Sequence, residues 1–181
     1  ANHDDLIQEK KDTLKGVGVD RLSIGIQSFS DAQLKSLNRA HTAEESLRCV
    51  KLAQDAGFTN ISIDLIYALP DLSSDQWEKE IQKAIELNVQ HISAYCLTVE
   101  KGTALHHFVQ KGSVQQADDP TEKRQFEIAM KFLPEAGFDH YEISNFGKPG
   151  FWSKHNTSYW KGEDYLGIGP SAHSFNGTER R

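Results

Sequence analysis

Cysteine is scarce in this sequence, with only Cys49 and Cys96 among 181 residues. The two stand alone, one within an expected helix and one at an expected strand end, so they form neither a metal-spaced pair nor a disulfide framework. No apolar run approaches the roughly 20 residues that cross a bilayer, and no signal-peptide pattern opens the chain. These absences indicate a protein of the reducing cytosol, and we expect a cytoplasmic location without a membrane span.

Basic clusters are absent as well. The formal net charge is -6 and no block of lysine or arginine occurs, which argues against bulk binding to nucleic acid or to an anionic membrane. The length is that of one domain with a real core. No methionine opens the sequence, so we expect it to be a piece of something longer.

Strand and helix patterns alternate along the chain, which is typical of βαβ units with a parallel sheet and right-handed crossovers. Capping boxes at Ser30, Thr42 and Ser73 mark three helix starts, and Asp119 with Pro120 marks a fourth. We expect strands at 21–27, 61–67, 91–98 and 140–146, and helices at 1–15, 30–37, 42–57, from 73 and from 119 to about 134. The stretches 99–117 and 151–160 are expected to be irregular.

Such a sheet has open edges. We expect the edge strand near Arg21–Ile26 to be covered or to pair with another chain, so that self-association through this edge is predicted.

The central strand, Ile61–Tyr67, carries a carboxylate, Asp64, in an apolar run. Burial of a carboxylate costs several kcal/mol unless a cation or hydrogen-bond donors replace its water. Two interpretations follow. Asp64 either accepts hydrogen bonds from a loop or pairs with a core arginine, or it faces a pocket and binds hydroxyl or amine groups of a ligand.

Polar residues also stand at or near the carboxyl ends of the expected strands, where α/β proteins bind ligands. They are Gln27, Asp64 and Thr98, with Tyr67 and Tyr95 close by. An amide, a carboxylate and a hydroxyl at one rim suit a polar small molecule, although such a pattern also arises by chance.

Two motifs lie in the last third of the chain. Gly167–Ala172 matches G-x-G-x-x-A, but Pro170 removes an amide and no βαβ unit follows, so we expect close backbone approach rather than a dinucleotide site. His155–Trp160 places one imidazole beside two large aromatics. This suits a flat apolar ligand with a metal, such as haem, or else a surface loop fixed by aromatic packing. No catalytic triad order and no zinc spacing is visible.

Several segments together resemble a known family. They are GVDRLSIGIQSF (18–29), Asn38-Arg39, NISIDLIYALP (60–70), HISAYCLTVEKGT (91–103), YEISNF (141–146), HNTSYW (155–160) and YLGIGPSAHS (165–174). In order and spacing they are similar to the oxygen-independent coproporphyrinogen III oxidase family of radical SAM proteins. HISAYCLTVEKGT and HNTSYW resemble its HemW-like haem-chaperone branch most.

The resemblance implies an α/β fold, the C-terminal half of a partial TIM-type (β/α)6 barrel, with further strand and loop segments after it. Residues 1–146 would form the latter βα units, and 147–181 a His/aromatic and Gly-rich segment of the same compact domain. Family members hold a 4Fe-4S cluster on a CxxxCxxC loop and use it to cleave S-adenosylmethionine to a radical. That loop is absent here, so we expect neither a cluster nor radical chemistry in the chain as given.

Site residues carried over by resemblance are Gln27, Arg39, Asp64, Thr98 and His173 for S-adenosylmethionine, and His155 for haem. The implied function is binding of S-adenosylmethionine and haem and delivery of haem to a recipient protein. The alternatives are oxidative decarboxylation of coproporphyrinogen III to protoporphyrinogen IX in haem biosynthesis, or a non-catalytic α/β fragment.

Overall fold

The structure is a computed structural model that describes residues 13–181, in two compact units divided between Phe151 and Trp152. Most of the helix expected at 1–15 lies outside the described residues, and residues 13–16 are helical. Among the described residues, no helix is long and apolar enough to cross a membrane.

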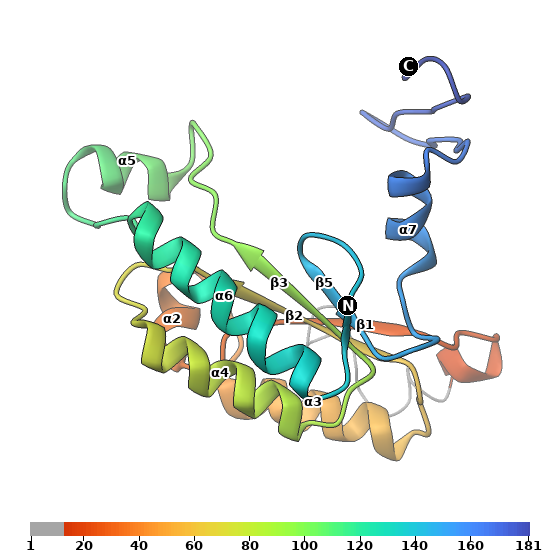
Figure 1. Cartoon of the computed structure of the whole chain (residues 1–181), viewed down its shortest axis with the longest axis horizontal. Coiled ribbons are helices and arrows are strands. Elements are labelled where there is room, and N and C mark those ends of the chain that lie inside the picture. Colours follow the sequence, from red (N-terminus) through yellow and green to blue (C-terminus); the bar gives the residue numbers. More distant parts are fainter. Residues whose placement is uncertain (1–12) are drawn as a thin grey trace. The chain divides into compact units, whose positions relative to one another are not determined.

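A five-stranded sheet forms the centre of the first unit, in the order β1-β2-β3-β5-β4 (Figure 1). Strands β1 (Leu22–Gln27), β2 (Ile61–Tyr67) and β3 (His91–Cys96) run parallel, as predicted. Strand β5 (Asn145–Gly147) pairs antiparallel with β3 and with β4 (Asp139–His140). Strand β1 therefore lies at one edge of the sheet, and its pairing with another chain stays a prediction.

The single strand predicted at 140–146 is wrong. Residues 141–144 bend between two short strands, because polar side chains bond the backbone there. His140 Nε2 lies 3.1 Å from the Ile143 carbonyl, and Ser144 N donates to Glu142 Oε1 at 3.2 Å. The bend makes β4 and β5 a hairpin instead of one parallel strand.

Figure 1 shows three helices along one side of the sheet: α3 (Ala43–Asp55), α4 (Ser74–Glu86) and α6 (Asp119–Glu135). Their N-termini follow the predicted capping chemistry at Thr42 and Ser73, where both capping boxes are complete. Asp118 caps α6 ahead of Pro120. Helix α2 (Asp31–Ser36) differs, since Ser30 makes no side-chain capping bond and Gln33 donates instead to the Pro70 carbonyl at 3.2 Å.

Two helices lie where irregular chain was predicted. Helix α5 (Ala104–Gln110) starts at the Thr103 cap, and α7 (Lys154–Lys161) starts at the Ser153 cap and ends at Gly162, whose φ is 64°. Neither helix buries a residue, so neither shows the apolar period from which a helix is predicted.

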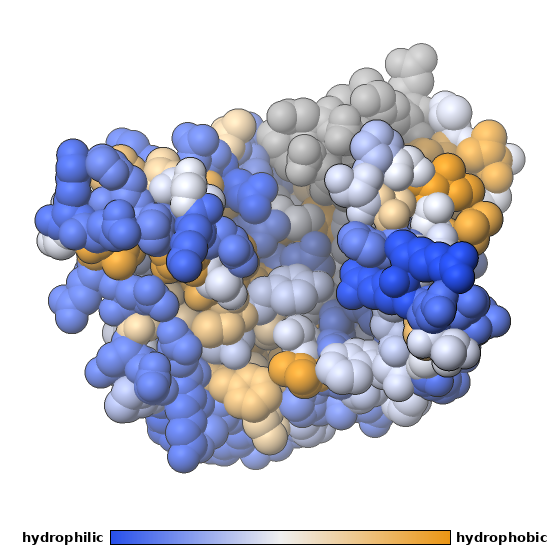
Figure 2. All heavy atoms as spheres, turned by 90° about the horizontal axis from the view of Figure 1, so that it is seen from above, coloured by the Kyte–Doolittle hydropathy of each residue, from blue (hydrophilic) through white to orange (hydrophobic). Residues whose placement is uncertain are grey.

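Alternation along the strands gives the sheet two unlike faces. The helix-covered face carries buried aliphatic side chains that pack with Trp77 and Ile81 of α4; its strand members are Leu22, Ile24, Ile26, Ile61, Ile63, Leu65, Ile92 and Ala94. The opposite side, here called the polar face, comprises Ser23, Gly25, Gln27, Ser62, Asp64, His91, Ser93 and Asn145. Figure 2 shows separate hydrophobic patches on a largely hydrophilic surface.

Candidate functional site

Asp64 lies at the middle of β2 on the polar face, partly buried. Ser23 Oγ lies 3.5 Å from each of its carboxylate oxygens, and Ser93 is its neighbour in register on β3. Burial raises the pKa of the Asp64 carboxyl above its usual range, while the contact with Ser23 and the charge of Arg21 oppose that rise. The carboxylate is thus poorly compensated inside the protein, as expected of a group that meets a ligand.

The charge of Arg21 also acts on the Asp64 carboxylate. Its Nη1 donates to Asn60 Oδ1 at 2.9 Å and to the Phe151 carbonyl at 3.2 Å. Burial lowers the pKa of the guanidinium, while Tyr141 and Asp64 raise it. Since these hydrogen bonds tie Arg21 to neutral groups, its charge acts on Asp64 through space.

Gln27 ends β1 in an unusual conformation, with a φ of 72°. The strand register shifts between Ile24 and Gln27, and the Gln27 side chain folds back over Gly25. A Cβ at position 25 would lie 2.7 Å from Gln27 Nε2. Glycine at 25 therefore leaves room for the Gln27 amide on the polar face, on the strand next to Asp64.

The other predicted residues of the first unit lie at the surface. Arg39 is exposed just after α2, where its N–H donates to the Leu34 carbonyl at 2.9 Å. Thr98 is exposed two residues beyond β3. Thr98 follows the carboxyl end of β3, as the sequence indicated, whereas Arg39 follows helix α2 and Asp64 lies within its strand.

His155 and His173 belong to the second unit, and both are exposed. His155 stands at one end of a row of rings. Its centroid lies 4.9 Å from Tyr159, Tyr159 lies 4.8 Å from Tyr165, and Tyr165 lies 6.0 Å from Phe175. The loop predicted at 151–160 is thus a helical turn bearing an imidazole and exposed aromatic side chains.

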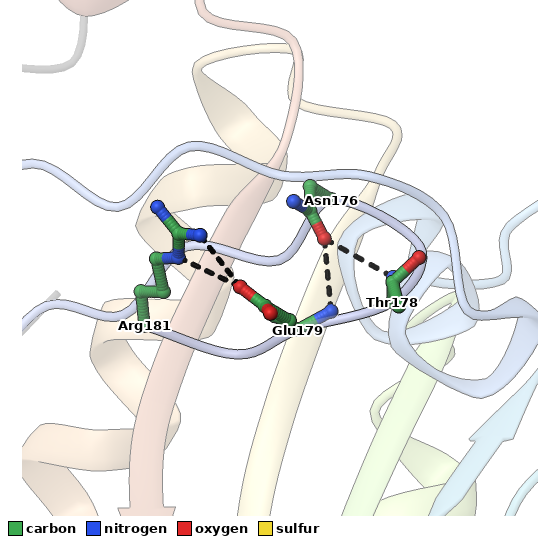
Figure 3. A network of polar contacts seen from close by, with 4 residues as sticks. All are labelled: Asn176, Thr178, Glu179 and Arg181. Atoms are coloured by element: carbon green, nitrogen blue, oxygen red, sulfur yellow. Dashed lines mark hydrogen bonds and ion pairs between the residues drawn. The ribbon is translucent and has the colours of Figure 1, made fainter.

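Backbone segments of this second unit approach each other closely. A Cβ at Gly167 would lie 2.2 Å from the His173 carbonyl oxygen, so the glycine-rich stretch permits backbone approach, as predicted. Figure 3 shows a network of polar contacts among residues that follow the glycine-rich stretch. Asn176 Oδ1 accepts from the N–H groups of Thr178 and Glu179 at 3.1 and 2.8 Å. Arg181 Nη2 pairs with Glu179 Oε2 at 2.6 Å.

A buried histidine was not anticipated as part of the polar face. His91 Nδ1 lies 2.7 Å from Ser62 Oγ, and its Nε2 lies 2.7 Å from the Tyr141 hydroxyl. Burial lowers the pKa of His91 to about 3, and the charge of Arg21 adds to this, so the ring is neutral at pH 7. The signal was the alternation of His91, Ser93 and Tyr95 with apolar residues in β3.

A separate groove of about 1050 Å³ lies between α2 and the segment 103–115. Leu97, Leu105 and Phe108 contribute apolar surface to it. Gln33 also lines the groove, and its Oε1 is buried without a hydrogen-bond partner. Asp64 is not among the lining residues, so this groove is distinct from the polar face.

The described residues do not fit an iron–sulfur cluster. Cys49 is buried in α3 and Cys96 is half-buried at the end of β3. Over residues 13–181 no group of three His, Cys, Asp or Glu side chains could hold a metal ion. A cluster held by cysteines has no ligand set within this part of the chain.

Comparison with known proteins places these features in a family. A model of the radical SAM superfamily matches residues 2–84. The heme chaperone HemW of Bacillus subtilis is 40% identical over 180 residues, which cover 99% of this chain and 48% of that protein. HemW of Escherichia coli is 42% identical over 156 residues, covering 86% and 40% respectively.

Solved structures agree on the fold. The structure of Escherichia coli coproporphyrinogen III oxidase (HemN), described as a radical SAM enzyme, matches with a TM-score of 0.77 at 22% identity, over 98% of this chain and 43% of that one. This confirms the predicted partial radical SAM barrel. The chain spans about half the length of the curated relatives it matches. By sequence and by fold, the chain belongs to the radical SAM superfamily, among the proteins that resemble HemW and HemN.

Proposed function

We propose that this chain forms part of a HemW-like protein, in which the polar face binds S-adenosylmethionine and the second unit binds haem for delivery to a recipient protein. The observation that carries the first half is Asp64, a partly buried carboxylate on the polar face with the Gln27 amide on the neighbouring strand. Relatives named heme chaperones, similar across nearly the whole chain, support the second half.

Each residue has a chemical task in this proposal. The Asp64 carboxylate and the Gln27 amide suit ribose hydroxyls or the amino group of S-adenosylmethionine, and the Arg39 guanidinium suits its carboxylate. The backbone at Thr98 would add a contact from the first unit on the adenosine side. When bound beside a 4Fe-4S cluster, S-adenosylmethionine supplies radical chemistry, and in a longer protein the cluster ligands would come from outside this chain.

For haem, His155 offers an exposed imidazole as an axial ligand. Tyr159 stands edge-on to it at 4.9 Å, and Trp160, 60% exposed, follows on the same helix. Neighbouring large aromatic side chains are seldom exposed together unless they bind a ligand or a partner. The exposed rings of Tyr159 and Trp160 suit the flat apolar face of a porphyrin.

The site for S-adenosylmethionine is tested in a longer protein, which contains this chain and has the length of the curated relatives. After anaerobic cluster reconstitution, Asp64→Ala is expected to weaken binding of S-adenosylmethionine at least tenfold in isothermal titration calorimetry. Asp55→Ala is the control, since Asp55 pairs with Lys51 on the surface of α3. Equal affinities of Asp64→Ala and wild type would disprove the assignment.

Haem binding is tested in the same protein by absorption spectroscopy. Haem titration is expected to give a shifted Soret band that His155→Ala loses, whereas His107→Ala, a change of an exposed histidine in α5, keeps it. Anaerobic conversion of coproporphyrinogen III to protoporphyrinogen IX by this protein would instead establish the decarboxylating oxidase.

The chain as given is expected to take up no cluster. Iron analysis after anaerobic reconstitution of the 181 residues should find no stoichiometric iron. Uptake of four irons per chain would contradict this expectation.

A further inference from the structure

Three polar side chains form a row across the sheet. Asp64 on β2 is in register with Ser93 on β3, and Ser93 is in register with Asn145 on β5. Ser93 and Asn145 are each 3% exposed. The row ends beside Glu142, in the YEISNF segment (141–146) to which the proposed function gives no role.

The orientation of the Asn145 amide is fixed by its neighbour. Asn145 Nδ2 donates to Glu142 Oε1, which also accepts from Ser144 N at 3.2 Å. A carboxylate only accepts hydrogen bonds, so the amide nitrogen must point toward Glu142. The amide oxygen, Oδ1, consequently faces Ser93 Oγ at 2.7 Å.

Ser93 has one hydroxyl proton and two acceptors that compete for it. A contact with Asp64 favours the ionised carboxylate only when that proton points at the carboxylate. The short bond to Asn145 Oδ1 directs the proton the other way. Ser93 Oγ is then left with lone pairs toward Asp64, which favour a protonated carboxyl that donates to them.

We propose that Ser93, Asn145 and Glu142 act as a positioning relay for Asp64: by holding the Ser93 proton on Asn145, they keep the Asp64 carboxyl in place and control whether it is charged. The relay stands on the bonds from Ser93 to Asn145 and from Asn145 to Glu142, and on the strand register that sets Ser93 beside Asp64. Its consequence for ligand binding rests on the proposed function, because an ionised Asp64 is the form that accepts bonds from ribose hydroxyl or amino groups.

Other charged and titratable groups around Asp64 come from each neighbouring element. Arg21 precedes β1 and attracts the ionised form, while Asp20 lies beside Arg21 in the chain. His91 on β3 stays neutral above pH 3 or so and is engaged with Ser62 and Tyr141. Glu142 acts through Asn145. Desolvation of Asp64 works in the same direction as the relay.

The relay is tested by carbon-13 NMR titration of the Asp64 carboxyl in the 181-residue chain. Glu142→Ala removes the acceptor that holds the Asn145 amide and lets it turn, so that Ser93 can donate to Asp64, and the Asp64 pKa is expected to fall by about one unit. Asn145→Ala removes the competing acceptor and should act in the same direction. Ser62→Ala is the matched control, a serine on the same face that is bonded to His91.

The Ser93→Ala variant separates the two directions of the hydrogen bond. A relay that directs the proton to Asn145 predicts that the Asp64 pKa does not rise in this variant. A rise in Ser93→Ala, with no change in Glu142→Ala, would show that Ser93 donates to Asp64 and would overturn the inference. Since Glu142 is only partly buried, its variant keeps the test available even if Asn145→Ala fails to fold.

A second measurement ties the relay to the ligand. In the longer protein, affinity for S-adenosylmethionine is expected to rise with pH through the Asp64 pKa, with the midpoint shifted down in Glu142→Ala. An unshifted midpoint with intact dependence on Asp64 would refute the relay and leave the proposed site standing. Binding that ignores Asp64→Ala would refute the proposed site, while the NMR titration would still decide on the relay.

Discussion

The two faces of the sheet are built by the same strands from adjacent residues, yet their chemistry is opposite. Ile63 and Leu65 are fully buried under the helices, while Asp64 between them lies among serines, a histidine and an asparagine. The strand side chains of the helix-covered face are aliphatic and contribute stability through the apolar area that they bury. On the polar face, each buried polar atom needs a hydrogen-bond partner. The Asp64 oxygens need one most, because they can carry a charge. The buried aliphatic core and the polar face are thereby separated by one residue step along β2.

Leu65→Ala is expected to have the largest effect on stability. It removes buried methyl groups from the helix-covered face and leaves a cavity, which costs about 2–5 kcal/mol of unfolding free energy in such cores. Urea denaturation followed by tryptophan fluorescence measures it, since Trp77 is fully buried on the same face. A loss below about 1 kcal/mol would mean that this face does not dominate the stability of the first unit.

His91 predicts an acid-sensitive polar face. Folded His91 binds its proton near pH 3 and an unfolded histidine near 6.5, so the unfolded state holds more protons between these values and stability falls as the pH drops through them. The contribution amounts to about 2 kcal/mol between pH 7 and pH 5.

Asp64 and Glu80 have raised pKa values and work against this loss, because their folded forms take up protons first. The His91→Gln variant isolates the histidine. The difference in unfolding free energy between wild type and variant should change by that amount over this pH range, and a constant difference would contradict the neutral assignment.

Ser73→Ala should weaken the helix layer by about 1 kcal/mol, since the Ser73 hydroxyl accepts from Gln76 N at 3.2 Å at the start of α4. The corresponding change at Ser30, which makes no capping bond, is the control and should have a smaller effect on helix stability. If thermal unfolding shows the same loss of stability in both variants, capping does not explain the effect of Ser73→Ala.

Asp64→Asn is expected to change stability least, by less than about 1 kcal/mol at pH 7, and toward greater stability. The raised pKa shows that the fold disfavours the charge, so a neutral side chain of the same shape relieves it. Chemical denaturation of the pair of proteins checks this. A strong destabilisation would assign Asp64 to structure instead of ligand binding.

The three parallel strands and the helices against them could be predicted from sequence because burial and capping leave local signs. The predicted strand Ile61–Tyr67 has the same first and last residues in the structure, and Thr42 and Ser73 cap their helices as predicted. Asp64 could be singled out for the same reason, as a charge in an otherwise apolar strand.

Other features left no such sign. Helices α5 and α7 bury no residue, so no apolar period marks them. The bend at 141–144 depends on contacts of His140 and Glu142 with nearby backbone, which composition does not reveal. Likewise, the bonds of His91 to Ser62 and Tyr141 join three separate stretches of chain, and only the fold brings them together.

The contact between Gly25 and Gln27 couples the substitutions that these two positions can accept. Any side chain at position 25 would displace the Gln27 amide, which lies 2.7 Å from the place of a Cβ there. Exchange of Gln27 for glycine or asparagine, residues that tolerate its φ of 72°, would leave position 25 open to alanine. Loss of the Gln27 amide would thus remove the reason for glycine at position 25, whereas an alanine introduced there first would push the flexible end of the Gln27 side chain away from its present place. Alanine at position 25 in a related sequence would therefore indicate that the side chain at position 27 is either replaced or displaced.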